Sequence, residues 1–277
     1  MQRTFPPFVG YTPRWEREKS RRGGEDRLLT EQGVRASTLV DRNANVKRAI
    51  ELMRVDLDMP LSHSQLARAA RMSEFHFSRV FHDATGLPPL RFQSALRLAR
   101  ARDLVVSTDD AVIEICLRIG YNSIGSFTRR FTELVGISPM RLRQRISERK
   151  LPEEAATNGG VRVRLTAEGG ELVGPRLVAA FESPLPFGKP LGSALSYSDS
   201  VLSLGGLGAK PFYLVAFGSN GKASLRSSPL LVTHEALAAS STLDLVARRI
   251  ESTDPPILSF VPFMVHWHHE QSATEKP

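Results

Sequence analysis

Residues 113–131 read IEICLRIGYNSIGSFTRRF, and this stretch decides the fold of the first half of the chain. Its first residues place apolar side chains at helical spacing, which predicts a short helix capped by Asp109 or Asp110. A tight turn follows, and Ser123 is positioned to cap a second helix that ends at Gly136. A short helix, a tight turn and a second helix together indicate a helix-turn-helix unit.

Residues 66–81 read LARAARMSEFHFSRVF and repeat this outline earlier in the chain. Here Ser73 caps the second helix and Gly86 ends it. In both units a proline follows the terminal glycine and prevents the helix from continuing. Composition alone does not produce such a tandem, so the sequence predicts two helix-turn-helix units.

Further helices flank the two units. Asn45 is placed to cap a helix that runs to about residue 56, and Ser62 caps the helix that opens the first unit. Residues 90–106 predict a long helix of about 25 Å between the units. A last basic helix follows Pro139, a residue favoured at the first helical position. Residues 45–150 therefore read as one all-helical domain.

Length and composition set the broad class of protein. A chain of 277 residues suggests two domains, at about 100–200 residues per domain. The sequence has no apolar run long enough for a membrane span, and its N-terminus lacks the apolar segment of a secretory signal. The single cysteine, Cys116, cannot form an internal disulfide, which fits a reducing cytoplasm.

The positive charge is concentrated in the first half of the chain. The net charge of +8 divides into +3 for residues 1–44, +7 for residues 45–150 and −2 for residues 151–277. A basic helical domain has the electrostatic character of a protein that binds a polyanion such as DNA.

Helical spacing separates core residues from outward residues in each second helix. Those expected to face the core are Phe77, Val80 and Phe81 in the first unit and Phe127, Phe131 and Leu134 in the second. Those left outward are Glu74, Phe75, Ser78, Arg79 and His82 in the first and Ile124, Gly125, Thr128 and Arg129 in the second. Arginine can read guanine, serine and threonine can bond base edges or phosphates, and an outward apolar side chain can contact a thymine methyl.

These residues closely resemble the DNA-binding region of the AraC/XylS family of transcription regulators. The match covers about 100 residues of the chain. It is strongest over residues 113–131 and the following GISPMRLR at 136–143, which is the family's signature segment in nearly full form. The first unit matches through LARAARMS at 66–73, FSRVF at 77–81 and the threonine and glycine at 85–86. The resemblance implies seven helices, with two recognition helices in successive major grooves about 34 Å apart.

The resemblance also implies roles for individual residues. The base readers would be Phe75, Ser78, Arg79, Ile124, Gly125, Thr128 and Arg129. Arg141, Arg143 and Arg145 would contact phosphates, which position the protein without specifying sequence. Family members often carry polar residues where Ile124 and Gly125 stand, so specific hydrogen bonding there is expected to be reduced.

Three of these roles have structural alternatives. Arg79 and Arg129 could instead be solvated or paired with Glu74 and Glu133, respectively. Phe75 could pack on the turn rather than read a base.

The remaining segments differ in composition and in expected secondary structure. Residues 1–44 read either as a disordered basic leader or as an arm that touches DNA phosphates, and residues 151–160 read as a linker. Residues 161–270 predict a β-rich domain of short strands, with either a helix or a further strand at residues 237–250. The fold class expected is therefore α+β multidomain, with an all-α tandem helix-turn-helix domain followed by a β-rich domain.

The β-rich domain is expected to bind a small effector, to hold two protomers together, or both. His266 and His268 would share a face of a strand, and His269 follows them, but we expect no physiological metal there and no cofactor. DNA-repair methyltransferases that carry this type of module need an activated cysteine, whereas Cys116 lies inside a helix-turn-helix unit. No Gly-x-Ser-x-Gly nucleophile motif is present, so we expect no enzyme.

The function expected is sequence-specific DNA-binding transcription regulation in the cytoplasm. The partners would be double-stranded DNA, RNA polymerase, a small-molecule effector and a second copy of the chain. A non-specific architectural DNA-binding protein is the rival interpretation, and it predicts no preference among duplex sequences.

Overall fold

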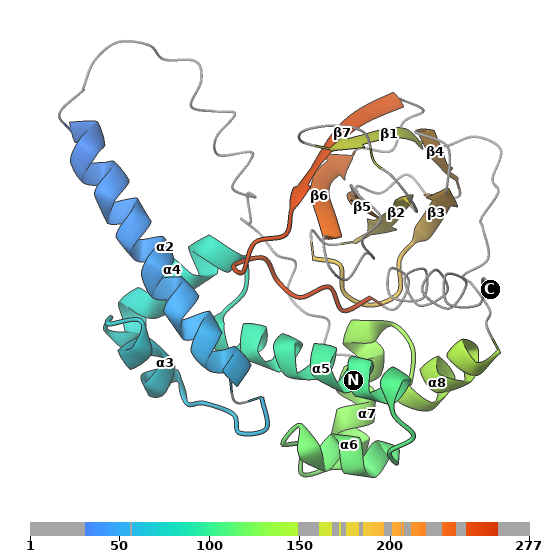
Figure 1. The fold of residues 1–277 in the computed structure, drawn as a ribbon, viewed down its shortest axis with the longest axis horizontal. Coiled ribbons are helices and arrows are strands. Elements are labelled where there is room, and N and C mark those ends of the chain that lie inside the picture. Colours follow the sequence, from blue (N-terminus) through green and yellow to red (C-terminus); the bar gives the residue numbers. More distant parts are fainter. Residues whose placement is uncertain are drawn as a thin grey trace, which may run out of the picture. The chain divides into compact units, whose positions relative to one another are not determined.

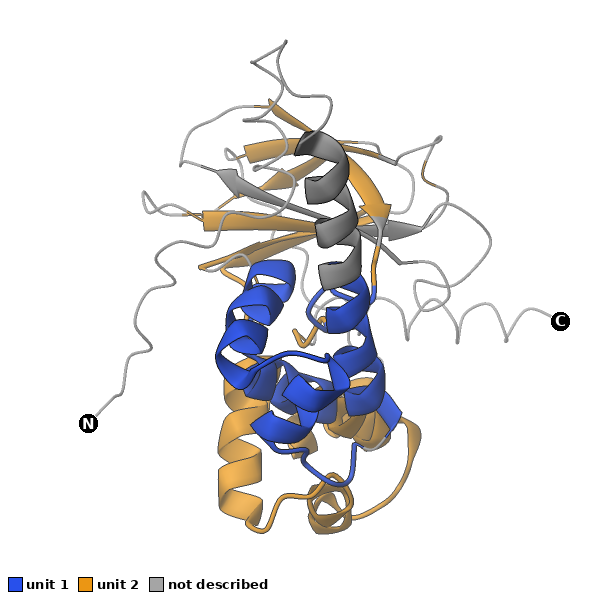
Figure 2. Cartoon of the chain, turned by 90° about the vertical axis from the view of Figure 1, so that its left-hand side faces the viewer, with its two compact units in different colours: residues 1–97, 252–256 blue, residues 98–251, 257–277 orange. Residues whose placement is uncertain are grey.

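The computed structural model describes residues 31–55, 57–148, 161–167, 172, 176–182, 185–196, 201–205, 207, 212–219, 229–236 and 242–259. Helices occupy the first part of the chain and strands the second, which confirms the expected fold class (Figure 1). The chain divides into two compact units, one of residues 1–97 with 252–256 and one of residues 98–251 with 257–277 (Figure 2). The two helix-turn-helix elements fall in different units. The expected linker and the histidines at 266–269 lie outside the described residues.

The first unit contains helices α2 (Glu31–Val55), α3 (His63–Ala69), α4 (Glu74–Thr85) and the start of α5 (Pro89–Ser107). Its core includes Val46, Ala49, Ile50 and Met53 of α2, all fully buried. These four side chains follow the helical spacing from which the helix was predicted.

The start of α2 corrects two sequence expectations. The helix begins at Glu31, so Asn45 lies in its interior and does not cap it, and residues 31–44 are helical rather than part of a disordered leader. Asparagine costs under about 0.7 kcal/mol in a helix interior relative to alanine, so it does not stop a helix that neighbouring contacts support.

The second unit contains the rest of α5 and the helices α6 (Val112–Arg118), α7 (Ile124–Val135) and α8 (Pro139–Ser147). The described part of the chain thus has seven helices, the number that the resemblance implied. The N-cap of α6 is Ala111, and neither Asp109 nor Asp110 occupies that position. Glu114 Oε2 instead accepts a hydrogen bond of 3.1 Å from the Ala111 backbone N–H.

Seven strands form one sheet in the order β3-β2-β5-β6-β7-β1-β4. They are β1 (Val161–Ala167), β2 (Arg176–Phe181), β3 (Gly192–Ser196), β4 (Val201–Leu204), β5 (Phe212–Ser219), β6 (Pro229–Ala236) and β7 (Thr242–Arg249). Five of the six pairings are antiparallel, whereas β1 and β7 pair in parallel. Residues 237–250, left open between helix and strand, contain strand β7.

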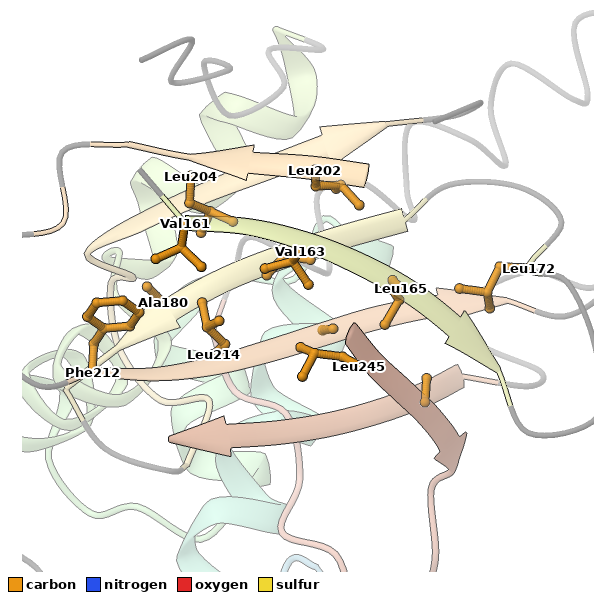
Figure 3. Close-up of a cluster of buried hydrophobic side chains, with 13 residues drawn as sticks. Val161, Val163, Leu165, Leu172, Ala180, Leu202, Leu204, Phe212, Leu214 and Leu245 are labelled. Carbon is orange, nitrogen blue, oxygen red and sulfur yellow. The ribbon is translucent and has the colours of Figure 1, made fainter. Parts of the chain in front are cut away.

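Strict alternation places the valine and leucine side chains of β1 in the core of this sheet. Val161, Val163 and Leu165 are buried, while Arg162 and Arg164 between them are exposed, because successive side chains of a strand point to opposite faces. The buried side chains form one apolar cluster with residues of β2, β4, β5 and β7, among them Leu204, Leu214 and Leu245 (Figure 3). The described residues thus give the sheet an apolar core in this region.

Within the second unit, the connection between β2 and β3 contacts the end of α7. The Gly188 N–H donates a hydrogen bond of 2.6 Å to the carbonyl of Leu134. Gly136, with φ of +92°, approaches so closely that a Cβ there would lie 2.6 Å from Gly188 C and from Lys189 N. Because the contact is between backbones, only glycine fits at residue 136.

The segment after β7 joins the same junction. The N–H groups of Leu258 and Ser259 both donate to the Pro186 carbonyl, at 3.3 and 2.9 Å, and Arg102 of α5 donates to the Ile257 carbonyl. The second unit is thereby tied together by hydrogen bonds among α5, α7 and the strand connections, which are main chain to main chain except for that of Arg102. None of the helices in the described residues is long and apolar enough to cross a membrane.

Candidate nucleic-acid interface

The first helix-turn-helix element is α3 and α4. Ser62 and Gln65 form a capping box: the Gln65 N–H donates to Ser62 Oγ at 3.3 Å, and the Ser62 N–H donates to Gln65 Oε1 at 2.7 Å. At the turn, Arg71 has a φ of +54°, the only positive value at a non-glycine residue in the described part of the chain. Ser73 occupies the N-cap position of α4 but makes no side-chain capping bond.

The inward face of α4 is the one predicted. Phe77, Val80 and Phe81 are buried, and the rings of Phe77 and Phe81 pack edge to face with centroids 5.3 Å apart. Phe75 is 82% exposed and so does not pack on the turn, and Arg79 is exposed beside it. Ser78 is half-buried on the same outward side of the helix.

His63 contacts two residues of this outward side and was missed by sequence reasoning. Its Nδ1 lies 3.1 Å from Glu74 Oε2, and its Nε2 lies 2.7 Å from Ser78 Oγ. The imidazole also contacts the Phe77 ring, with centroids 5.7 Å apart. The first residue of α3 thus holds two side chains on successive turns of α4. No periodicity links residue 63 to residue 78, so no sequence pattern pointed to this contact.

The second element is α6 and α7. Ser123 Oγ accepts from the Ser126 N–H at 3.4 Å and caps α7 as expected. Tyr121 packs against Phe127 with ring centroids 5.6 Å apart, and its N–H donates to the Cys116 carbonyl. Cys116 is buried, and burial raises the pKa of its thiol because the charged thiolate would be desolvated. It is a core residue, as the sequence suggested.

The outward face of α7 carries the four predicted residues together. Ile124, Gly125 and Arg129 are exposed and Thr128 is half-buried, and with Thr132 and Glu133 they line an open hollow. A Cβ on Gly125 would meet only Ser123 Oγ, at 3.9 Å, so the helix surface is open at this position. The inward face differs from the prediction at one residue, because Val135 is fully buried whereas Leu134 is half-buried.

The proposed partners of the two outward arginines are engaged elsewhere. Glu74 bonds His63, and Glu133 pairs with Arg130 at 3.1 Å. Within the described residues, the structure contains no ion pair of Arg79 or Arg129. The alternative that these arginines are bound by neighbouring carboxylates is therefore not supported.

Counted from their caps, α4 and α7 match position for position. Each has a serine N-cap, buried phenylalanines four and eight residues later, and a left-handed glycine thirteen residues later, Gly86 with φ of +75° and Gly136. Five and six residues after the cap come a hydroxyl and an exposed arginine: Ser78 and Arg79 in α4, and Thr128 and Arg129 in α7. The two helices thus share their caps and core positions, and also the outward pair of a hydroxyl and an arginine.

The arginines of α8 divide into two kinds. Arg141 and Arg145 are exposed. Arg143 is half-buried, and its guanidinium donates to the carbonyls of Val105, Thr108 and Asp110 at 3.1, 3.3 and 2.8 Å. These bonds give Arg143 a structural role, because they anchor α8 to the end of α5 and the residues that follow it.

Residues 66–145 match the family model described as a helix-turn-helix domain. This part of the chain is a helix-turn-helix domain. Its resemblance to AraC-type regulators, expected from the sequence, is confirmed.

Several known proteins are similar over this region. An HTH-type transcriptional regulator of Mycobacterium tuberculosis is 39% identical over 80 residues, which are 29% of this chain and 31% of that protein. The MmsAB operon regulatory protein of Pseudomonas aeruginosa is 31% identical over 96 residues, 35% of this chain and 31% of that protein. A solved transcriptional regulator of Chromobacterium violaceum with an AraC-type DNA-binding domain is 27% identical, covers 37% of this chain and 92% of its own, and has a TM-score of 0.36. The chain spans about a third of the length of the two regulators named here from Mycobacterium tuberculosis and Pseudomonas aeruginosa.

Proposed function

We propose that the chain is a transcription regulator that binds specific duplex DNA sequences through α4 and α7. The observation that carries this proposal is the repeated pair of a hydroxyl and an exposed arginine, five and six residues after each cap. In a helix-turn-helix protein the start of the second helix faces the base edges of the major groove. Arginine bonds the O6 and N7 atoms of guanine, and a hydroxyl can bond any base.

The surroundings of the pairs favour DNA as the partner. Residues 45–150 carry a net charge of +7, and the exposed Arg141 is placed for a phosphate contact. Phe75 and Ile124 leave apolar surface at the first turn of each helix, where a thymine methyl could be contacted. The relatives named above are regulators, which agrees with this proposal and with a protein that is not an enzyme.

The test uses the full chain and a pool of randomised duplexes from which a bound motif is enriched. Arg129→Ala should weaken binding to that motif by about 1–3 kcal/mol and relax the requirement at one base pair. Arg162→Ala is the matched control, because it removes an exposed arginine of β1 and should leave the preferred sequence unchanged. If the wild-type chain enriches no motif at fixed salt, the rival non-specific architectural function is correct.

We further propose that the β-rich part regulates the DNA-binding part, by binding a small effector or by joining two protomers. The hydrogen bond from Gly188 to Leu134 supports this, because it connects a strand loop to the end of α7. The apolar cluster of Figure 3 argues against a polar effector among these buried side chains. Light scattering of the full chain, with a fragment of residues 31–150 as control, tests the second alternative. If the β-rich part joins two protomers, the measured mass of the full chain should be twice its monomer mass, whereas the fragment should have the mass of one monomer.

We also propose that the protein acts in the cytoplasm, with RNA polymerase as a further partner. A pull-down of purified polymerase by the chain bound to its enriched duplex tests that partner. Retention of polymerase that does not exceed retention by the duplex alone would exclude it.

A further inference from the structure

His63 contacts and orients Ser78 of α4, the second helix of the first helix-turn-helix element. Its ring is 27% exposed and lies between the Glu74 carboxylate and the Ser78 hydroxyl, with one nitrogen at 3.1 Å from the first and the other at 2.7 Å from the second. Phe77 supports the ring from the core side, at a centroid distance of 5.7 Å. Two polar contacts and one ring contact therefore fix the orientation of the imidazole.

The Glu74 carboxylate decides which nitrogen carries the proton in the neutral ring. A carboxylate only accepts hydrogen bonds, so His63 Nδ1 must be the donor. Nε2 is then the acceptor, because a neutral imidazole has one of each. When the ring is neutral, the Ser78 hydroxyl therefore donates its single proton to Nε2 and presents only lone pairs to the outside.

We infer that His63 is a specificity-determining residue for the DNA binding proposed above, because its neutral ring makes Ser78 an acceptor only. In the major groove, adenine and cytosine present exocyclic amino donors, whereas guanine and thymine present carbonyl oxygens. Ser78 therefore favours an amino base over a keto base at the position it faces. A serine without this partner would rotate its hydroxyl and accept or donate as the base requires.

The second helix-turn-helix element provides an internal comparison. It keeps the hydroxyl as Thr128, but the residue at the start of α6 is Val112 and the residue after the cap of α7 is Ile124. Neither side chain can form a hydrogen bond, so neither can hold the Thr128 hydroxyl as His63 and Glu74 hold that of Ser78. The arrangement of His63, Glu74 and Ser78 is therefore not repeated around Thr128 at the corresponding positions of α6 and α7.

The test compares base preferences rather than affinities. A motif is first enriched from randomised duplexes by the full wild-type chain, and affinities are then measured for every single-base variant of it. His63→Phe keeps a ring against Phe77 and removes both hydrogen bonds. It should reduce the preference for the amino base at one position by about fivefold, the effect of about one hydrogen bond, and leave the other positions unchanged.

Three further variants separate readout from packing. Ser78→Ala should lose the same preference. The double variant with Ser78→Ala and His63→Phe should have the same base preferences as Ser78→Ala alone. Glu74→Gln alters an exposed side chain and should not unfold the chain. Because an amide can donate as well as accept, the variant should reduce the preference for the amino base at the same position. His82→Phe, on the last turn of α4, is the control and should keep the wild-type preference.

The outcomes distinguish this inference from the function on which it rests. If the wild-type chain enriches no motif, the proposed function itself fails. If it enriches a motif but His63→Phe and Glu74→Gln lower the affinities for all base variants equally, His63 only joins α3 to α4 and the inference is wrong. A wild-type preference for a keto base at the position that Ser78→Ala relaxes would also overturn it.

Discussion

Substitution of Gly136 by alanine tests the junction between α7 and the strand loop. The added Cβ would lie 2.6 Å from Gly188 C and Lys189 N and 2.8 Å from Gly188 O. These are backbone atoms that cannot turn aside as a side chain end can, and overpacking of this kind costs about 1–3 kcal/mol. The φ of +92° adds about 1–2 kcal/mol for a residue with a Cβ. We therefore expect Gly136→Ala to lower the stability of this region by about 2–5 kcal/mol.

Hydrogen exchange of the Gly188 amide measures this effect locally, because that N–H is bonded to the Leu134 carbonyl only while the junction is closed. Exchange should be slow in the wild-type chain and much faster in the variant. Gly136→Asn is the matched control, since asparagine tolerates the left-handed region but carries the same Cβ. Both variants should open the junction. Slow exchange in Gly136→Ala, or a normal junction in Gly136→Asn, would refute the close approach of the two backbones.

Other expected outcomes concern single side chains. Arg143→Ala should lower the free energy of unfolding by about 2–3 kcal/mol in urea titrations, because its hydrogen bonds to carbonyls are lost. Arg141→Ala should leave the free energy of unfolding unchanged. It should reduce the slope of log DNA affinity against log salt concentration by about one. Ser62→Ala should cost about 1 kcal/mol in thermal unfolding, and Ser73→Ala clearly less because its hydroxyl makes no capping bond. Burial raises the pKa of Cys116, so stability should fall as pH rises past the ordinary pKa of a thiol, because the unfolded chain loses that proton first. A pH titration of stability that is identical in Cys116→Ala would contradict this assignment.

Local signals made the helical half predictable. The caps at Ser62 and Ser123, the terminal glycines and the spacing of the phenylalanines act within a few residues, and a sequence displays them directly. The start of α2 and the N-cap at Ala111 were missed. Asparagine and aspartate near a helix suggest caps, but which residue becomes the cap also depends on contacts that periodicity does not include.

Long-range contacts explain what the sequence could not show. The pairing of His63 with Ser78 and the anchoring of Arg143 on the end of α5 join residues 15 to 38 positions apart. In the β-rich half, the runs at β1, β2 and β5 were visible from alternation and composition, whereas the parallel pairing of β1 with β7 joins strands about 80 residues apart. Only the folded chain reveals such partners, because no local propensity selects between strands.

The most direct test of DNA recognition by both helices is a map of the base pairs that each outward arginine reads. Affinities of the wild-type chain, Arg79→Ala and Arg129→Ala are measured at fixed salt for all single-base variants of the enriched duplex. We predict that each variant relaxes a different guanine-containing base pair, and that the two positions lie about one helical turn of DNA apart. Equal loss of affinity for every sequence in both variants, or relaxation at one shared position, would contradict recognition of DNA by α4 and α7 as a pair.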